Sequence, residues 1–204
     1  PLGLAASVVR TLDPRRDSER PQGELARPSR VELVGIRAQA GQEGLAVVRA
    51  TNPTRVVILG GGSWNSIDGL QKLVLPEDDR NLVATVHYYT PMEFTHQGAP
   101  WAAEHKDRVG VPWTGTDQER RRIDLDFLRA QQWAVAHDRP VHLGEFGAYD
   151  RADMDSRARY TAAVARAAER LGWSWAYWQF DSDFVVYDVE TDAWVEPLRK
   201  ALVP

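Results

Sequence analysis

Short apolar runs alternate with longer amphipathic segments along most of the chain, from residue 43 to the end. Four of these runs have the length of a β-strand, namely residues 55–59, 82–86, 141–145 and 173–178. Segments with helical spacing of their apolar residues follow them, at 66–73, 116–137, 153–171 and 195–202. Strand and helix alternating four times predict parallel strands joined by right-handed crossover helices.

The start of the longest helix is marked in the sequence. Thr116 and Glu119 have the capping-box spacing, in which the side chain of each residue binds the backbone N–H of the other. The buried stripe of this helix is predicted to be Ile123, Phe127, Ala130 and Ala134. The strand at 55–59 is almost entirely apolar, so we expect it to be fully buried, and we expect a long loop over residues 90–115.

Residues 1–42 differ in character from the rest of the chain. Arginines and prolines are scattered through this segment, and no helical or strand period persists in it. We therefore divide the chain into a poorly patterned segment, 1–42, and an α/β segment, 43–204.

Each predicted strand ends in side chains that are common in enzyme active sites. In chain order these are Trp64 and Asn65, His87 and Tyr89, Glu145, and Trp178. Barrels of the (β/α)8 type place their catalytic groups at the carboxyl ends of parallel strands, so the pattern predicts one site at one edge of the sheet. Because a complete barrel needs about 250 residues, we predict an α/β fold of the TIM-barrel type that is incomplete, with about its last four β/α units and an irregular N-terminal segment.

The composition of the chain argues against several kinds of partner and binding site. A net charge of −4 argues against nucleic acid as a partner, and no apolar run is long enough to cross a bilayer. The chain has no cysteine, which excludes disulfides and thiolate metal sites, and no signal peptide is visible at its start. The eight tryptophans could fill the core, but tryptophan is rarely buried whole, and an excess of tryptophan is typical of a groove that stacks on flat ligands such as sugar rings.

Six short motifs carry a resemblance to a known family. They are RATNP (49–53), GGSWNS (61–66), HYY (87–89), FTHQGA (94–99), GEFG (144–147) and YWQF (177–180). Each is modest alone, but together they resemble bacterial endoglucanases of glycoside hydrolase family 5, the retaining cellulases and related β-glycanases. The resemblance runs from about residue 43 to residue 204 and implies the C-terminal half of the catalytic barrel.

The resemblance implies a catalytic group. Glu145 corresponds to the nucleophile, Tyr89 to the hydroxyl that supports it, and His87 to the histidine beside it. A retaining glycosidase needs a carboxylate that attacks the anomeric carbon and a second carboxyl group about 5–5.5 Å away that serves as acid and base. Hydrogen-bond donors such as tyrosine and histidine suit the first carboxylate, because they keep it ionised. Read alone, Glu145 could instead cap a turn or pair with an arginine.

The resemblance also implies substrate-binding residues. Trp178 corresponds to the platform for the sugar next to the cleaved bond, and His96 corresponds to a loop histidine that lines the cleft. Trp64 and Asn65 are assigned to the cleft by their place at a strand end. A core tryptophan and a solvated loop histidine are the alternative readings of Trp178 and His96. No cofactor and no metal is implied.

The family's acid/base glutamate belongs in an Asn-Glu-Pro motif, which this sequence lacks. The acid/base residue is therefore unknown, and residues 1–42 are interpreted as a segment unrelated to the family or read out of frame. The predicted function is hydrolysis of β-1,4-linked glucan with retention, through a glycosyl-enzyme on Glu145. The alternatives are a β-mannanase-type specificity and an inactive or incomplete carbohydrate-binding fragment.

The expected partner is a β-glucan oligo- or polysaccharide, with no nucleic acid and no membrane. The family implies a secreted or periplasmic location. Half a barrel has two open sheet edges, which favours self-association.

Overall fold

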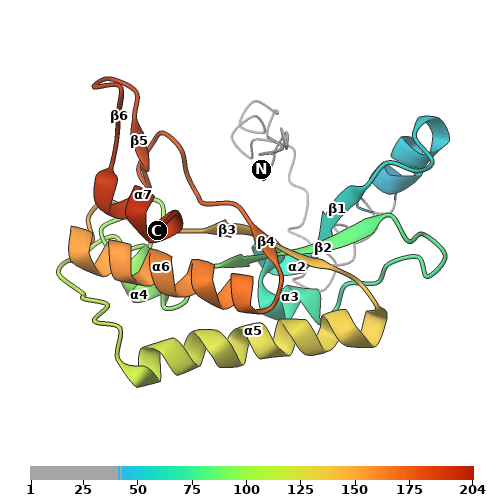
Figure 1. Cartoon of the computed structure of the whole chain (residues 1–204), viewed down its shortest axis with the longest axis horizontal. Coiled ribbons are helices and arrows are strands. Elements are labelled where there is room, and N and C mark those ends of the chain that lie inside the picture. The colour runs from blue at the N-terminus through green and yellow to red at the C-terminus, as the bar shows by residue number, and fades with distance from the viewer. Residues whose placement is uncertain (1–40, 42) are drawn as a thin grey trace, which may run out of the picture.

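The computed structural model describes residue 41 and residues 43–204 (Figure 1). A four-stranded parallel sheet crosses its centre. Its strands are β1 (Val57–Gly60), β2 (Leu82–Tyr88), β3 (Val141–Phe146) and β4 (Ser174–Trp175), and they lie in that order. The predicted succession of parallel strands is confirmed. The division of the chain at residue 43 stays a prediction, because all but one of the preceding residues lie outside the described part.

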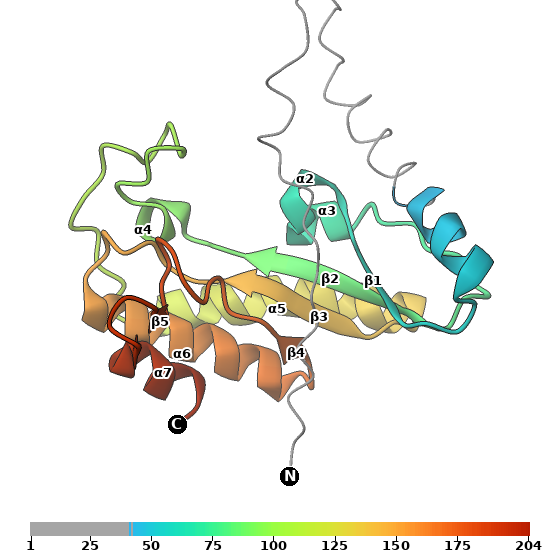
Figure 2. The same cartoon turned by 90° about the horizontal axis from the view of Figure 1, so that it is seen from above.

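Helices cover one face of the sheet. A helix over residues 43–51 precedes β1, and the others are α2 (Gly62–Asn65), α3 (Ile67–Leu70), α4 (Met92–Thr95), α5 (Asp117–His137), α6 (Met154–Arg170) and α7 (Glu196–Leu202). The core lies between the sheet and α3, α5 and α6, and α7 packs on α6 (Figure 1, Figure 2). No helix of the described part is both long and apolar enough to cross a membrane.

Alternation along β2 separates the core from the site. Ala84, Val86 and Tyr88 belong to the core beneath the helices. Successive side chains of a strand point to opposite faces, so Thr85 and His87 point to the other face of the sheet. This face is where the predicted catalytic residues gather.

The helix signals in the sequence are confirmed. Thr116 caps α5, its side chain accepts from the Glu119 N–H, and the Glu119 carboxylate accepts from the Thr116 N–H. All four residues of the predicted stripe are buried. Asp153 caps α6 in the same way, since its side chain accepts from the backbone N–H of Ser156.

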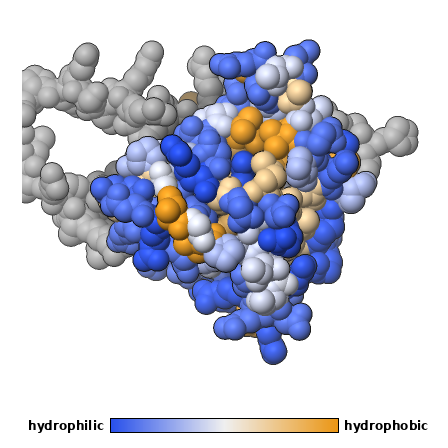
Figure 3. Space-filling model, turned by 90° about the vertical axis from the view of Figure 1, so that its left-hand side faces the viewer, coloured by the Kyte–Doolittle hydropathy of each residue, from blue (hydrophilic) through white to orange (hydrophobic). Residues whose placement is uncertain are grey.

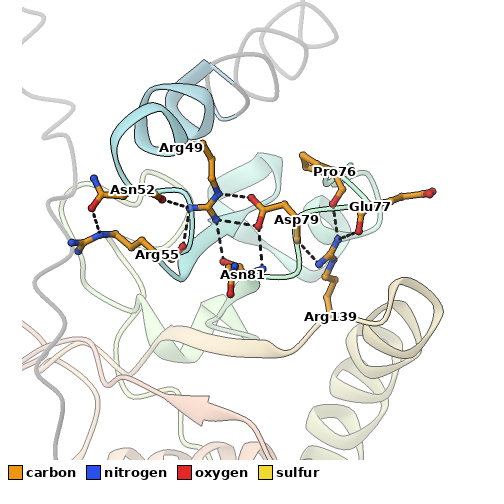
Figure 4. Close-up of polar contacts among 8 residues, drawn as sticks. All are labelled: Arg49, Asn52, Arg55, Pro76, Glu77, Asp79, Asn81 and Arg139. Carbon is orange, nitrogen blue, oxygen red and sulfur yellow. Dashed lines mark hydrogen bonds and ion pairs between the residues drawn. The ribbon is translucent and has the colours of Figure 1, made fainter.

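An arginine network closes the end of the sheet opposite to the site (Figure 4). Arg139 is only 6% exposed and donates to the backbone carbonyls of Pro76, Glu77 and Asp79 at 2.6, 3.1 and 2.6 Å. Arg49 binds both carboxylate oxygens of Asp79, at 2.6 and 3.2 Å. The hydrogen bond from Arg49 lowers the pKa of Asp79. The network ties the helix before β1 and the chain before β3 to the loop that leads into β2.

The strand at 55–59 was expected to be fully buried, and this prediction is wrong. The strand that forms is Val57–Gly60, in which Ile58 is 38% exposed. Within the described part, β1 pairs only with β2, so its outer edge has no neighbour to bury it. An apolar run predicts a buried strand, but a strand is buried only where other elements cover it on both sides.

Three other boundaries differ from the prediction. The strand at 173–178 pairs in the sheet only over Ser174–Trp175, and the helix predicted at 66–73 ends at Leu70. The predicted loop at 90–115 contains α4. The sequence analysis also missed a hairpin of β5 (Tyr187–Asp188) and β6 (Ala193–Trp194) before α7.

Candidate active site

Glu145 lies at the carboxyl end of β3, and two side chains contact the same oxygen of its carboxylate. The Tyr89 hydroxyl donates to its Oε2 at 3.1 Å, and Nδ1 of His87 lies 3.1 Å from the same atom. The side chains of His87 and Glu145 are 17% and 21% exposed, so the group is sheltered but open to solvent. The three residues that the sequence predicted as catalytic are therefore brought together.

A β-bulge turns Glu145 toward His87. The register of β2 and β3 shifts between Val86 and His87, so that Leu143 pairs with Val86 and Glu145 with His87. The extra residue is Gly144. A Cβ there would lie 2.5 Å from Oγ1 of Thr85 and 3.2 Å from Nε2 of His87, so the two strands approach closely only because this residue is glycine.

Tyr89 is held by the segment that follows it. Oγ1 of Thr95 donates to the Tyr89 carbonyl at 2.6 Å and lies 2.9 Å from Nδ1 of His96. The Tyr89 ring makes edge contacts with His96 and Phe184, with centroids 5.0 and 5.9 Å apart. The predicted cleft residue His96 is thus beside Tyr89, a predicted catalytic residue.

Trp178 joins the site through a small hydrophobic cluster. The backbone N–H of Trp178 donates to the carbonyl of Phe146 at 2.9 Å. The side chains of Trp178 and Tyr89 pack against a cluster that contains Phe184. A Cβ on Gly147 would lie 2.2 Å from the Trp178 carbonyl oxygen, so this glycine permits the close approach. Trp178 is therefore placed at the same end of the sheet as Glu145.

The turn after β1 places Asn65 and Trp64 differently. Nδ2 of Asn65 lies 3.1 Å from Nε2 of His87, so Asn65 contacts one of the predicted catalytic residues directly. Trp64 is 80% exposed, and its assignment to the cleft stays a prediction. Figure 3 shows the end of the molecule that carries the carboxyl ends of the strands, where hydrophobic patches alternate with hydrophilic surface.

Burial determines the protonation states of two residues of the candidate site, Tyr89 and His96. Desolvation and the nearby Glu145 carboxylate raise the pKa of Tyr89, so it remains a neutral donor. Desolvation lowers the pKa of His96 to about 4, so it is neutral at pH 7. Within residues 41 and 43–204, no three His, Asp or Glu side chains are grouped as metal ligands would be.

The low pKa of His96 predicts a pH dependence of stability. In the unfolded chain its pKa is about 6.5, so between about pH 6.5 and 4 the unfolded state binds more protons than the folded state. The contribution of neutral His96 is therefore complete above pH 6.5 and is lost as the pH falls toward 4. We expect the urea midpoint of His96→Gln to fall less than that of the wild type between pH 7.5 and 5. An equal fall in both proteins would contradict this assignment.

Sequence reasoning missed the groups that hold these side chains. Gly144, Thr95 and Phe184 carry no pattern of their own, because a bulge, a backbone hydrogen bond and an aromatic contact arise only in the folded chain. Gly144 does stand inside an apolar strand run, where a glycine indicates a bulge or a close approach of another strand. No acid/base residue was predicted, and none is assigned here.

A known protein family matches most of this chain. The family model described as Cellulase (glycosyl hydrolase family 5) matches residues 35–183. The chain belongs to glycosyl hydrolase family 5. Endoglucanase H of Acetivibrio thermocellus is 32% identical to this family member over 169 residues, which cover 78% of this chain and 17% of that protein.

Solved structures of endoglucanases also match this chain. An endoglucanase matches with a TM-score of 0.80 and 39% identity, covering 83% of this chain and 54% of that one. Cel5A of Thermotoga maritima in complex with cellobiose matches with a TM-score of 0.80 and 36% identity, covering 83% of this chain and 55% of that one. The predicted TIM-barrel type of fold is confirmed, and this family member spans about half the length of these structures.

Proposed function

We propose that this chain carries the nucleophile half of an active site that hydrolyses β-1,4-linked glucan with retention of configuration. The observation that carries the proposal is the Tyr89 hydroxyl, which donates to Oε2 of a strand-end glutamate while Nδ1 of His87 lies 3.1 Å from the same oxygen. Membership in the cellulase family and the endoglucanases among its relatives support the substrate class.

The chemistry follows from the two oxygens of Glu145. The donors on Oε2 stabilise the ionised carboxylate, and Oε1 attacks the anomeric carbon as the bond to the leaving oxygen breaks. The oxocarbenium-like transition state is cationic, so the carboxylate stabilises it before the new bond is complete. Water then attacks the anomeric carbon, the bond to Glu145 breaks with a second inversion, and the proton of the water passes to the group that serves as acid and base. The proton for the leaving oxygen comes from an acid/base group that is not among the residues assigned here.

Trp178, His96, Trp64 and Asn65 are proposed to bind the sugar chain. Trp178 would stack on the sugar whose bond is cleaved. Neutral His96 would hydrogen-bond a hydroxyl, because a ring without charge both donates and accepts. The relatives that act on polysaccharide support a secreted or periplasmic location. Among the described residues the outer edge of β1 has no neighbouring strand, which supports self-association; sedimentation velocity would detect it.

A substrate with a good leaving group tests the function without an acid catalyst. 2,4-Dinitrophenyl β-cellobioside needs no proton on its leaving oxygen, so formation of the glycosyl-enzyme from it requires the nucleophile but no acid catalyst. We expect dinitrophenolate release, and we expect proton NMR to show β-cellobiose as the first product. The α-anomer as first product would contradict a retaining mechanism, and oligosaccharide binding without any release would favour a carbohydrate-binding fragment.

Mannan is a second candidate substrate. Cel5A of Thermotoga maritima, which matches this chain with a TM-score of 0.79, has also been solved in complex with mannotriose. Comparing the release rates from dinitrophenyl β-cellobioside and β-mannobioside distinguishes the two specificities. A faster rate on the mannobioside would assign the chain to mannan.

Tyr89→Phe should slow the reaction without disturbing the fold. The variant keeps the ring that contacts His96 and Phe184 but loses the hydroxyl that donates to Glu145. Hydrogen bonds to charged groups contribute about 1.5–3 kcal/mol, so kcat/KM for dinitrophenyl β-cellobioside should fall by about 10- to 100-fold. An unchanged kcat/KM, with an unchanged urea midpoint, would show that Tyr89 does not support the nucleophile.

A further inference from the structure

The imidazole of His87 bridges Glu145, at the end of β3, and Asn65, the last residue of α2. On one side Nδ1 lies 3.1 Å from Oε2 of Glu145, and on the other Nε2 lies 3.1 Å from Nδ2 of Asn65. We propose that Asn65 is a positioning residue, which holds His87 as the neutral tautomer with its hydrogen on Nδ1 and so directs an N–H donor at the nucleophile.

The partners of the two ring nitrogens determine the tautomer. An ionised carboxylate only accepts hydrogen bonds, so the nitrogen that faces Glu145 must carry a hydrogen. A neutral imidazole has one donor and one acceptor, which leaves Nε2 with a lone pair. The amide nitrogen of Asn65 is a donor and satisfies that lone pair. The other tautomer would set a lone pair against the Glu145 carboxylate and an N–H against the Asn65 amide group.

The backbone presents Asn65 to His87 in a fixed way. Ser63, Trp64 and Asn65 have φ values of 56°, 54° and 57°, in the left-handed region where asparagine is better tolerated than most residues. The other end of the amide lies against the end of β1, since a Cβ on Gly60 would be 1.9 Å from Oδ1 of Asn65. A glycine at residue 60 therefore makes room for the amide in the orientation that faces His87.

The chain of contacts explains why a turn beyond the first strand belongs to the site. Nδ2 of Asn65 lies against Nε2 of His87, and Nδ1 of His87 lies against the same Glu145 oxygen that the Tyr89 hydroxyl binds. The ends of β1, β2 and β3 are thereby coupled through one imidazole. Asn65 then acts on the reaction through His87 even where it makes no contact with the sugar.

Nitrogen NMR tests the tautomer independently of activity. Long-range proton–nitrogen spectra of the 15N-labelled chain at pH 7, with His87 assigned through His87→Gln, distinguish the two tautomers and the imidazolium ion. We expect a protonated Nδ1 and an unprotonated Nε2 in the wild type. The opposite tautomer or the imidazolium ion in the wild type would overturn the proposal.

Two variants remove the control by Asn65 in different ways. Asn65→Gly deletes the amide and suits the left-handed backbone, whereas Gly60→Ala pushes the amide away without altering any catalytic side chain. In both we expect His87 to lose the pure Nδ1–H tautomer. The matched control is Asn52→Ala, whose amide binds Thr51 and Arg55 and does not contact His87. A His87 spectrum that is unchanged in Asn65→Gly would overturn the proposal.

The kinetic consequence rests on the proposed function. We expect Asn65→Gly to lower kcat for dinitrophenyl β-cellobioside by about tenfold, the usual effect of losing one hydrogen bond, and to shift the acid limb of the pH–rate profile, while Asn52→Ala leaves both unchanged. If no variant and no wild type releases dinitrophenolate, the proposed function fails, and the NMR result still decides the role of Asn65. If the wild type is active and Asn65→Gly retains its rate and pH profile, the positioning role is wrong.

Discussion

Replacing Glu145 by glutamine is expected to lower kcat/KM for dinitrophenyl β-cellobioside by about 1,000-fold or more, as loss of a nucleophile does in other covalent mechanisms. The neutral amide cannot form the glycosyl ester, although its oxygen can still accept from Tyr89 and His87. The fold should therefore persist. Steady-state release of dinitrophenolate measures the loss, and the urea midpoint checks that the variant is folded.

The matched control for this variant is Glu77→Gln. Glu77 is exposed at the opposite end of the sheet, where only its backbone carbonyl takes part in the arginine network and its side chain points away (Figure 4). We expect its activity to equal that of the wild type. If Glu145→Gln retained more than a tenth of the activity, Glu145 would not be the nucleophile.

Arg139→Leu is expected to lower the free energy of unfolding by about 3 kcal/mol, because three backbone carbonyls lose a charged donor in a place that water cannot reach freely. Leucine retains much of the apolar stem but none of the hydrogen bonds to residues 76, 77 and 79. Urea unfolding followed by circular dichroism measures the change.

Arg129→Leu serves as the control for Arg139→Leu. Arg129 forms an exposed ion pair with Asp68 at 2.7 Å, and exposed pairs of this kind contribute about 0–1 kcal/mol. If the two variants lost the same stability, the buried network would contribute no more than an ordinary surface pair. A loss in Arg139→Leu alone would show that this network contributes more stability than an exposed ion pair does.

Local signals in the sequence were enough to predict α5, α6 and α7 and the succession of parallel strands. Thr116 with Glu119 fixes the start of α5, and the stripe from Ile123 to Ala134 fixes the face that it buries. These features depend on residues within a few turns of each other, so they are readable before the chain folds. The exposure of β1 was not readable, because the burial of a strand depends on neighbours far away in the sequence.

Some features of the candidate site could likewise be predicted from the sequence, and others could not. Residues at the strand ends, such as Glu145 and Tyr89, were predicted from their positions and from family motifs. The bulge at Gly144 and the bridge from Asn65 to His87 were not predicted, because each depends on the register of two strands. Asn65 was predicted to bind substrate, and the structure places its amide on His87. Trp64 and the sugar-binding roles remain predictions.

The most direct test of the account is to trap the glycosyl-enzyme. 2,4-Dinitrophenyl 2-deoxy-2-fluoro-β-cellobioside forms the covalent intermediate but hydrolyses slowly, and its leaving group needs no acid catalyst. Intact-mass and peptide analysis should find one added fluorocellobiosyl group per chain, attached to Glu145 and absent in Glu145→Gln. A label on another residue, or no label on folded protein, would contradict the assignment of Glu145 as the nucleophile of a working site.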